Sequence, residues 1–129
     1  MLRIDDIVKY LEQIAPTWLA EDGDKIGLQL GGLNNRVKKV FVTVDCTANV
    51  VNTAIKENID LIISHHPLIY NPIKNLCETD PEICNIINAL KAGISVYVMH
   101  TNYDSATNGI NDILASTLDL QNTSILFAT

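Results

Sequence analysis

The chain has 129 residues, of which 47% are hydrophobic and 19% charged, and its formal net charge is −6. This length and hydrophobicity indicate one globular domain over residues 1–129 and exclude a disordered chain. The acidic balance argues against nucleic-acid binding, and the lack of a signal peptide or of an apolar run of about 20 residues predicts a cytoplasmic protein without a membrane span.

The first predicted element is an amphipathic helix. Apolar residues recur at helical spacing over residues 4–15, and a proline ends the pattern. We expect Trp18 and Leu19 to fold back onto this helix as part of the core. The acidic stretch Glu21–Lys25 indicates a solvated turn, because it is too short for a twelve-residue calcium loop. Residues 26–31 then predict a short strand closed by glycine.

The middle of the chain predicts two strands and the helix between them. The strand over residues 37–44 has an apolar second half, which favours a central place in a sheet. Thr47 is placed to cap a helix over residues 48–57. Residues 60–64 form the next strand, and the loop 67–79 after it is long enough to hold one helical turn.

Asp80 and Pro81 mark the start of the next helix, as a capping residue followed by proline at the first helical position. A buried strand over residues 94–99, a mostly helical segment over 105–118 and a last strand over 124–128 follow. Strands that alternate with helices of this length predict an α/β fold, with a mostly parallel sheet and helices on both faces.

All three histidines of the chain lie at the ends of predicted strands. His65 and His66 directly follow one strand within Ser-His-His-Pro, and His100 follows another, with Asp104 four residues further on. In parallel sheets ligands bind beyond the carboxyl ends of the strands. Imidazole and carboxylate are ligands for zinc, iron and manganese. The sequence therefore predicts a divalent-metal site, with His65, His66 and Asp104 as the candidate ligands.

The adjacent histidines leave two arrangements open. Neighbouring side chains of an extended chain point to opposite sides, so we do not expect His65 and His66 to hold one ion side by side. Either each reaches a different ion, or one is a ligand and the other supports it. We expect His100 to orient a ligand or a water molecule. Asp45, at a third strand end, is expected only to accept hydrogen bonds from the following loop.

The other reactive side chains form no familiar catalytic pattern. The chain has an odd number of cysteines, Cys46, Cys77 and Cys84, and none of them form a Cys-x-x-Cys pair. We therefore expect reduced thiols, with a zinc pair of Cys77 and Cys84 as the alternative. The glycines form no phosphate loop or dinucleotide motif. Ser64 lacks the flanking glycines of a serine-hydrolase elbow.

Over nearly its whole length the chain resembles the Nif-three-like proteins, also known as GTP cyclohydrolase I type 2 homologues. The resemblance rests on three motifs, with support from residues 26–31 and 44–47: Ile63-Ser-His-His-Pro-Leu-Ile-Tyr70, His100-Thr-Asn-Tyr-Asp104 and Gly109-Ile-Asn-Asp-Ile-Leu-Ala115. It implies an α/β fold and a centre of two divalent metal ions, zinc, iron or manganese. The family's ligands fall on His65, His66 and Asp104.

The resemblance also implies a function and an assembly. A metal-dependent hydrolase of a nucleotide-like or phosphate-bearing small molecule is the first expectation, and a non-catalytic metal-binding interaction or regulatory module is the alternative. Members of the family form homohexamers, so we expect self-association. They are much longer, and their second half supplies a further histidine and a glutamate. We therefore expect this chain to correspond to the first half, with an incomplete metal site.

The chain departs from the family in one loop. Gly23 and Lys25 stand where the family usually has Trp and Asn. The resemblance therefore assigns no role to the polar turn before the first strand.

Overall fold

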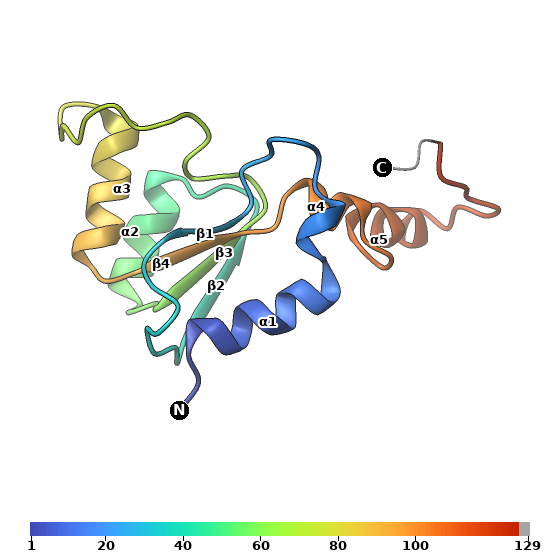
Figure 1. The fold of residues 1–129 in the computed structure, drawn as a ribbon, viewed down its shortest axis with the longest axis horizontal. Helices are drawn as coiled ribbons and strands as arrows, with labels where there is room; N and C mark the ends of the chain where they lie inside the picture. Colours follow the sequence, from blue (N-terminus) through green and yellow to red (C-terminus); the bar gives the residue numbers. More distant parts are fainter. Residues whose placement is uncertain (127–129) are drawn as a thin grey trace.

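The computed structural model describes residues 1–126, which form a four-stranded sheet with helices on both faces (Figure 1). The strand order is β1-β4-β3-β2, and β2, β3 and β4 run parallel while β1 is antiparallel to β4. The strands are β1 Gly27–Leu30, β2 Val40–Thr43, β3 Leu61–Ser64 and β4 Ser95–Val98. The predicted α/β fold with a mostly parallel sheet is confirmed.

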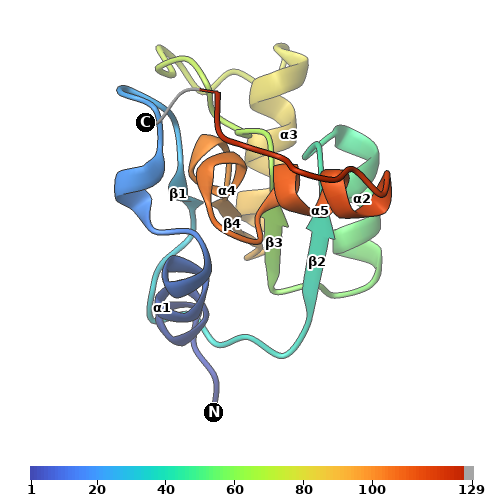
Figure 2. The same cartoon turned by 90° about the vertical axis from the view of Figure 1, so that its right-hand side faces the viewer.

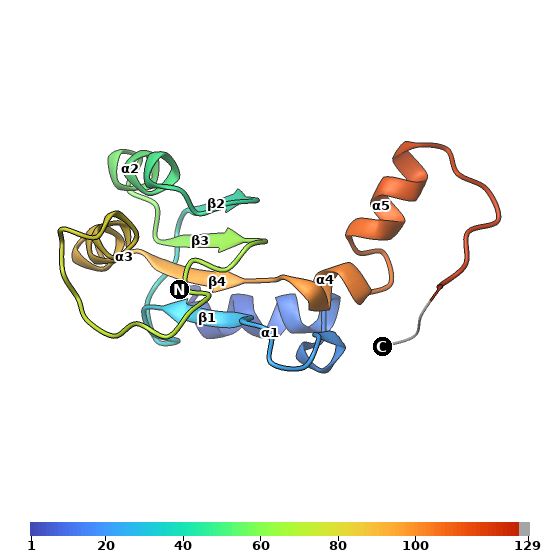
Figure 3. The same ribbon diagram turned by 90° about the horizontal axis from the view of Figure 1, so that it is seen from above.

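The two faces of the sheet are covered by different helices. Helix α1 (Ile4–Ile14) packs on one face, and α2 (Ala48–Lys56) and α3 (Pro81–Lys91) pack on the other (Figures 1 and 3). Side chains alternate along β4, so that Tyr97 contacts the α1 side while its neighbours contact α2 and α3. Because both faces are buried, the inner strands are apolar at successive positions.

Local sequence signals start the two helices on that second face. The side chain of Thr47 accepts a hydrogen bond from the N–H of Val50 at the start of α2. Asp80 accepts from the N–H groups of the first turn of α3, where Pro81 occupies the first helical position. Both predicted caps are confirmed.

The predicted helical segment over residues 105–118 contains one helix, α5 (Ile110–Thr117). A break over residues 106–109 separates it from a short helix that the sequence did not predict, α4 (Thr101–Ser105). A side chain at Gly109 would overlap the carbonyl oxygen of Tyr103, so the close approach at the break requires glycine. Helix α5 projects beyond the sheet (Figures 1 and 3), and it therefore lies in front of the sheet in Figure 2.

Two expectations about burial are wrong. Trp18 is 78% exposed, because the short 3-10 helix Thr17–Leu19 packs Leu19 on the core and turns Trp18 outward. Strand β2 is an edge strand of the sheet that residues 1–126 form, and Val42 is 74% exposed. Apolar composition predicted burial correctly for the inner strands but could not show which strand lies at the edge.

The remaining differences concern irregular segments. The loop over residues 67–79 contains no helical turn, and residues 124–126 form no strand. The rest of the predicted last strand, residues 127–128, lies outside the described residues. No helix among residues 1–126 is both long enough and apolar enough to cross a bilayer.

Candidate metal centre

Three imidazole rings converge beyond the carboxyl ends of β3 and β4. The ring centroids of His65, His66 and His100 are 5.0, 5.1 and 5.7 Å apart, and one ring nitrogen of each lies within 4.8 Å of the others. Two nitrogens on one ion, with bonds of about 2.1 Å, cannot be more than about 4.2 Å apart. The ring nitrogens of the trio are therefore close to the spacing of ligands that share a metal ion.

The backbone explains why the adjacent histidines face the same space. The N–H of His65 donates to the Thr43 carbonyl at 3.1 Å, and the N–H of His66 donates to the Val44 carbonyl at 2.9 Å. In a regular strand successive N–H groups point to opposite sides, so regular pairing ends here. The expectation that the two rings point apart is therefore not met.

Hydrogen bonds hold the rings of His65 and His66 through Nδ1. Nδ1 of His65 is 2.9 Å from the Met99 carbonyl oxygen, and Nδ1 of His66 is 2.6 Å from Oδ1 of Asp45. Carbonyl and ionised carboxylate oxygens only accept, so each Nδ1 donates and Nε2 of the neutral ring is free. Metal-binding histidines are oriented in this way by a second hydrogen bond.

His100 is held by a carboxylate from a distant part of the chain. Oδ1 of Asp24 lies 2.9 Å from Nδ1 of His100, across 76 positions of sequence, and the Asp24 side chain is only 5% exposed. Burial alone would raise the pKa of Asp24, but hydrogen bonds from Thr101, His100 and the N–H of Lys25 outweigh it and hold the pKa at about 2. The expected solvated turn is therefore wrong for Asp24, whose carboxylate is largely shielded from solvent.

Asp104 lies on α4, about one helical turn after His100, and not on the strand itself. Its Oδ1 is 3.7 Å from Nε2 of His65. Two ligands of one tetrahedral ion are separated by about 3.3 Å. The structure thus brings Asp104 close to His65. Its carboxylate does not belong to the cluster of His65, His66 and His100 whose ligand atoms lie within 4.8 Å of one another.

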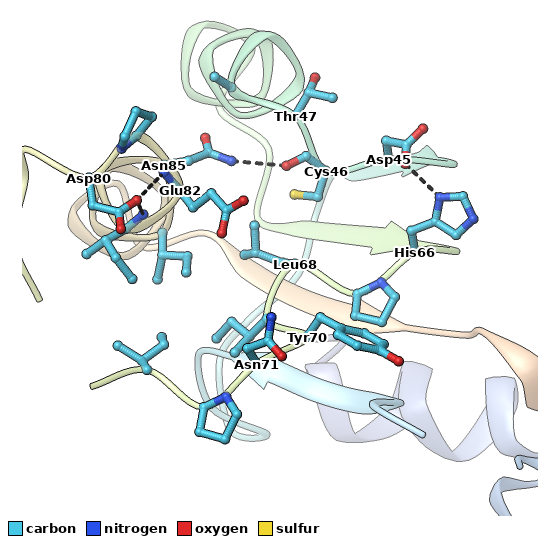
Figure 4. A pocket seen from close by; sticks show the side chains of 18 of the residues that line it. Asp45, Cys46, Thr47, His66, Leu68, Tyr70, Asn71, Asp80, Glu82 and Asn85 are labelled. Atoms are coloured by element: carbon cyan, nitrogen blue, oxygen red, sulfur yellow. Dashed lines mark hydrogen bonds and ion pairs between the residues drawn. The ribbon is translucent and has the colours of Figure 1, made fainter. Parts of the chain in front are cut away.

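A hollow of about 660 Å³ opens beside His66 (Figure 4). Its walls are the turn 45–48, the loop 66–75 and the start of α3, where Asn85 donates to the Cys46 carbonyl at 3.0 Å. A second hollow of about 730 Å³ is lined in part by Asp104. Small-molecule sites commonly have volumes of this order. The histidine trio is therefore flanked by space for a ligand.

Sequence reasoning located the three histidines and Asp104 but missed the partners that orient them. The Asp45 carboxylate lies 2.6 Å from the ring of His66, a partner that the sequence reasoning did not assign to it. Asp24 stood out only as one of several acids in a turn. No local pattern marks either aspartate as a histidine partner, because each contact joins segments far apart in the sequence.

The chain is similar to bacterial and archaeal proteins. The family model described as Duf34/NIF3 (NGG1p interacting factor 3) matches residues 2–129. The GTP cyclohydrolase 1 type 2 homolog of Bacillus subtilis is 44% identical over 123 residues, which are 95% of this chain and 33% of that protein. The Methanocaldococcus jannaschii protein of the same name is 35% identical over 127 residues, 98% of this chain and 51% of that protein.

Solved structures show the same fold. A Bacillus cereus protein related to NIF3 superposes with a TM-score of 0.95 at 42% identity, over 99% of this chain and 35% of that one. Reduced HcgD from Methanocaldococcus jannaschii superposes with a TM-score of 0.90 at 35% identity, over 98% and 50%. The chain therefore spans about a third to about half of the length of these relatives.

Proposed function

The chain belongs to the Duf34/NIF3 family, and on this premise we propose that it binds two divalent metal ions through His65, His66 and Asp104. One observation carries the proposal: every ring of the histidine trio has its Nδ1 tied to an oxygen, which leaves Nε2 free. Zinc, iron and manganese all suit such a set of imidazole and carboxylate groups. Three side chains are few for two ions, so we expect weak affinity in this chain alone.

We further propose that the whole protein is a metal-dependent hydrolase of a nucleotide-like or phosphate-bearing small molecule. A divalent ion supplies Lewis-acid chemistry for hydrolysis when it is bound. The hollow beside His66 supports this proposal, because it provides space for a substrate next to a candidate ligand. The name GTP cyclohydrolase 1 type 2 homolog, which the relatives carry, is consistent with that reaction class.

A metal-binding interaction or regulatory module without catalysis is the second candidate. Asp24 and Asp45 are both engaged in holding imidazole rings, so neither carboxylate is free to act as a general base. For assembly we propose self-association up to the hexamer that the resemblance implies. The exposed apolar residues of β2 and α5 support that proposal.

Metal binding is tested by loading the purified chain separately with zinc, iron(II) and manganese and counting the retained ions by elemental analysis. We expect His65→Ala and His66→Ala to retain less metal than the unaltered chain, with the fold intact by circular dichroism. Gln13→Ala, at an exposed position of α1, is the control and should retain the same amount. Fewer than about 0.2 ions per unaltered chain with every metal would overturn the binding proposal.

Catalysis is tested with a panel of nucleotides and phosphate esters, with and without the retained metal. A metal-dependent hydrolase should hydrolyse at least one of these compounds only when the protein is loaded with metal, and His66→Ala should abolish that turnover. Retained metal without turnover across the panel would contradict the hydrolase and favour the binding module.

A further inference from the structure

Thr101 ties the loop of residues 21–25 to the start of α4. The N–H of Glu21 donates to Oγ1 of Thr101 at 3.0 Å, and the Thr101 hydroxyl in turn donates to Oδ2 of Asp24. The backbone N–H of Thr101 donates to the same Oδ2 at 3.2 Å, and the N–H of Lys25 donates to Oδ1 at 2.7 Å. The Asp24 carboxylate is therefore held from both its own loop and the helix.

These contacts decide the direction of the hydrogen bond between Asp24 and His100. Because Oγ1 of Thr101 accepts from Glu21, its own proton is available to Asp24, and the carboxylate is the acceptor there. An ionised carboxylate has no proton to donate. Nδ1 of His100, 2.9 Å from Oδ1 and 3.1 Å from Oδ2, must therefore donate, and the lone pair of the neutral ring lies on Nε2.

The backbone of His100 is fixed as firmly as its ring. Its N–H donates to Oδ1 of Asn102 at 2.9 Å. Asn102 is buried, and its Nδ2 donates to the carbonyl oxygen of Ala15 at 2.8 Å. With backbone and Nδ1 both anchored, the ring has one preferred orientation, which places it in the trio with His65 and His66.

We propose that Asp24 is the residue that positions His100 as a third imidazole ligand of the metal centre. This inference rests on the proposed metal-binding function and changes the role of His100, which the sequence suggested only as an orienting group. A carboxylate on the far side of an imidazole increases its basicity and balances the charge of the cation. The centre then has four candidate ligand side chains: His65, His66, His100 and Asp104.

The tautomer of His100 is the first test, and it needs no metal. Long-range proton–nitrogen NMR of the metal-free chain, at a pH high enough for the His100 ring to be neutral, distinguishes protonated from unprotonated ring nitrogens, and His100→Gln identifies the signals. We expect a proton on Nδ1 and none on Nε2. A proton on Nε2 of His100 would overturn the inference. The measurement uses the unaltered chain, so it stays decisive if a variant of Asp24 does not fold.

Zinc titration by calorimetry is the second test. Asp24→Asn removes the anion at nearly constant shape, and Asp22→Asn makes the same charge change at an exposed position of the same loop. We expect Asp24→Asn to weaken zinc binding by about 10- to 100-fold. His100→Gln should weaken it at least as much, and Asp22→Asn should match the unaltered chain.

The outcomes separate the inference from the proposed function. Unchanged zinc affinity in a folded Asp24→Asn, or in His100→Gln, would overturn the role of Asp24 and His100 and leave binding by the other ligands standing. If the unaltered chain binds no zinc, iron(II) or manganese, the proposed function itself is overturned and this inference is overturned with it.

Discussion

The carboxylates beside the three imidazoles differ in burial, and this difference sets how much each contributes to stability. The Asp24 side chain is only 5% exposed and accepts from several donors, so its loss would leave hydrogen-bonding groups unpaired at a cost of about 1–3 kcal/mol. Asp45 is 60% exposed, and exposed ion pairs contribute about 0–1 kcal/mol. The contact between Asp45 and His66 therefore matters more for the orientation of the ring than for folding.

The cysteines differ at the same scale and give a prediction of reactivity. Burial raises the pKa of Cys46 to about 11, whereas hydrogen bonds from the Thr79 hydroxyl and backbone lower the pKa of the exposed Cys77 thiol. The thiolate is the reactive form, so we expect iodoacetamide at mildly alkaline pH to modify Cys77 at least about 10-fold faster than Cys46. Timed alkylation followed by peptide mass spectrometry measures both rates.

The unfolded chain is the control for that experiment, since both thiols should react at similar rates in concentrated urea. Equal rates in the folded protein would show that the hollow beside His66, which Cys46 lines, is more open than the structure indicates.

At the scale of elements, the break between α4 and α5 brings the second helix back against Asp104. The side chain of Asn111 on α5 donates to the backbone carbonyl of Asp104 at 3.0 Å, so the second helix supports the residue that faces His65. The break brings Gly109 against the carbonyl oxygens of Tyr103 and Ala106. The path of the chain after the metal centre thus depends on one residue without a side chain.

Gly109→Ala tests this dependence. The added methyl group has no room, so we expect the free energy of unfolding to fall by about 1–3 kcal/mol, as for an overpacked site. Gly32→Ala is the matched control, because its nearest neighbour would be Oδ1 of Asn35 at 3.6 Å, an ordinary contact. Urea denaturation of both variants gives the comparison, and equal stabilities would contradict the tight packing at the break.

At the scale of the whole molecule, the α1 face of the sheet is only partly covered. Helix α1 packs over Leu61 and Tyr97 of the inner strands, while Val40, Val42 and Val44 at the β2 edge are exposed. An exposed apolar edge strand can pair with another chain. The uncovered edge and its valines are the physical basis for expecting self-association.

Val42→Lys tests that expectation, because a lysine on an edge strand opposes pairing between strands. We expect size-exclusion chromatography with light scattering to show a smaller assembly or a weaker concentration dependence than for the unaltered chain. Asn52→Lys adds the same charge on an exposed position of α2 and should leave the assembly unchanged. Identical masses for the unaltered chain and Val42→Lys would exclude the β2 edge from the contact.

The sequence by itself determined the α/β class, the helix caps at Thr47 and Asp80, and the segments that carry the three histidines. These features depend on local physics: hydrophobic periodicity, capping side chains and proline act within a few residues. The convergence of polar side chains beyond the parallel strands followed from the same pattern. For that reason the sequence alone indicates His65, His66 and Asp104 as candidate ligands.

Only the tertiary structure decided which groups contact one another. The partnership of Asp24 with His100 joins residues 76 positions apart, and the shared orientation of His65 and His66 depends on where pairing with β2 stops being regular. The exposure of Trp18 and the edge position of β2 depend on strand order and on the cover that other elements provide. Periodicity predicts which side of an element is apolar, whereas its neighbours are determined by the packing of the whole chain.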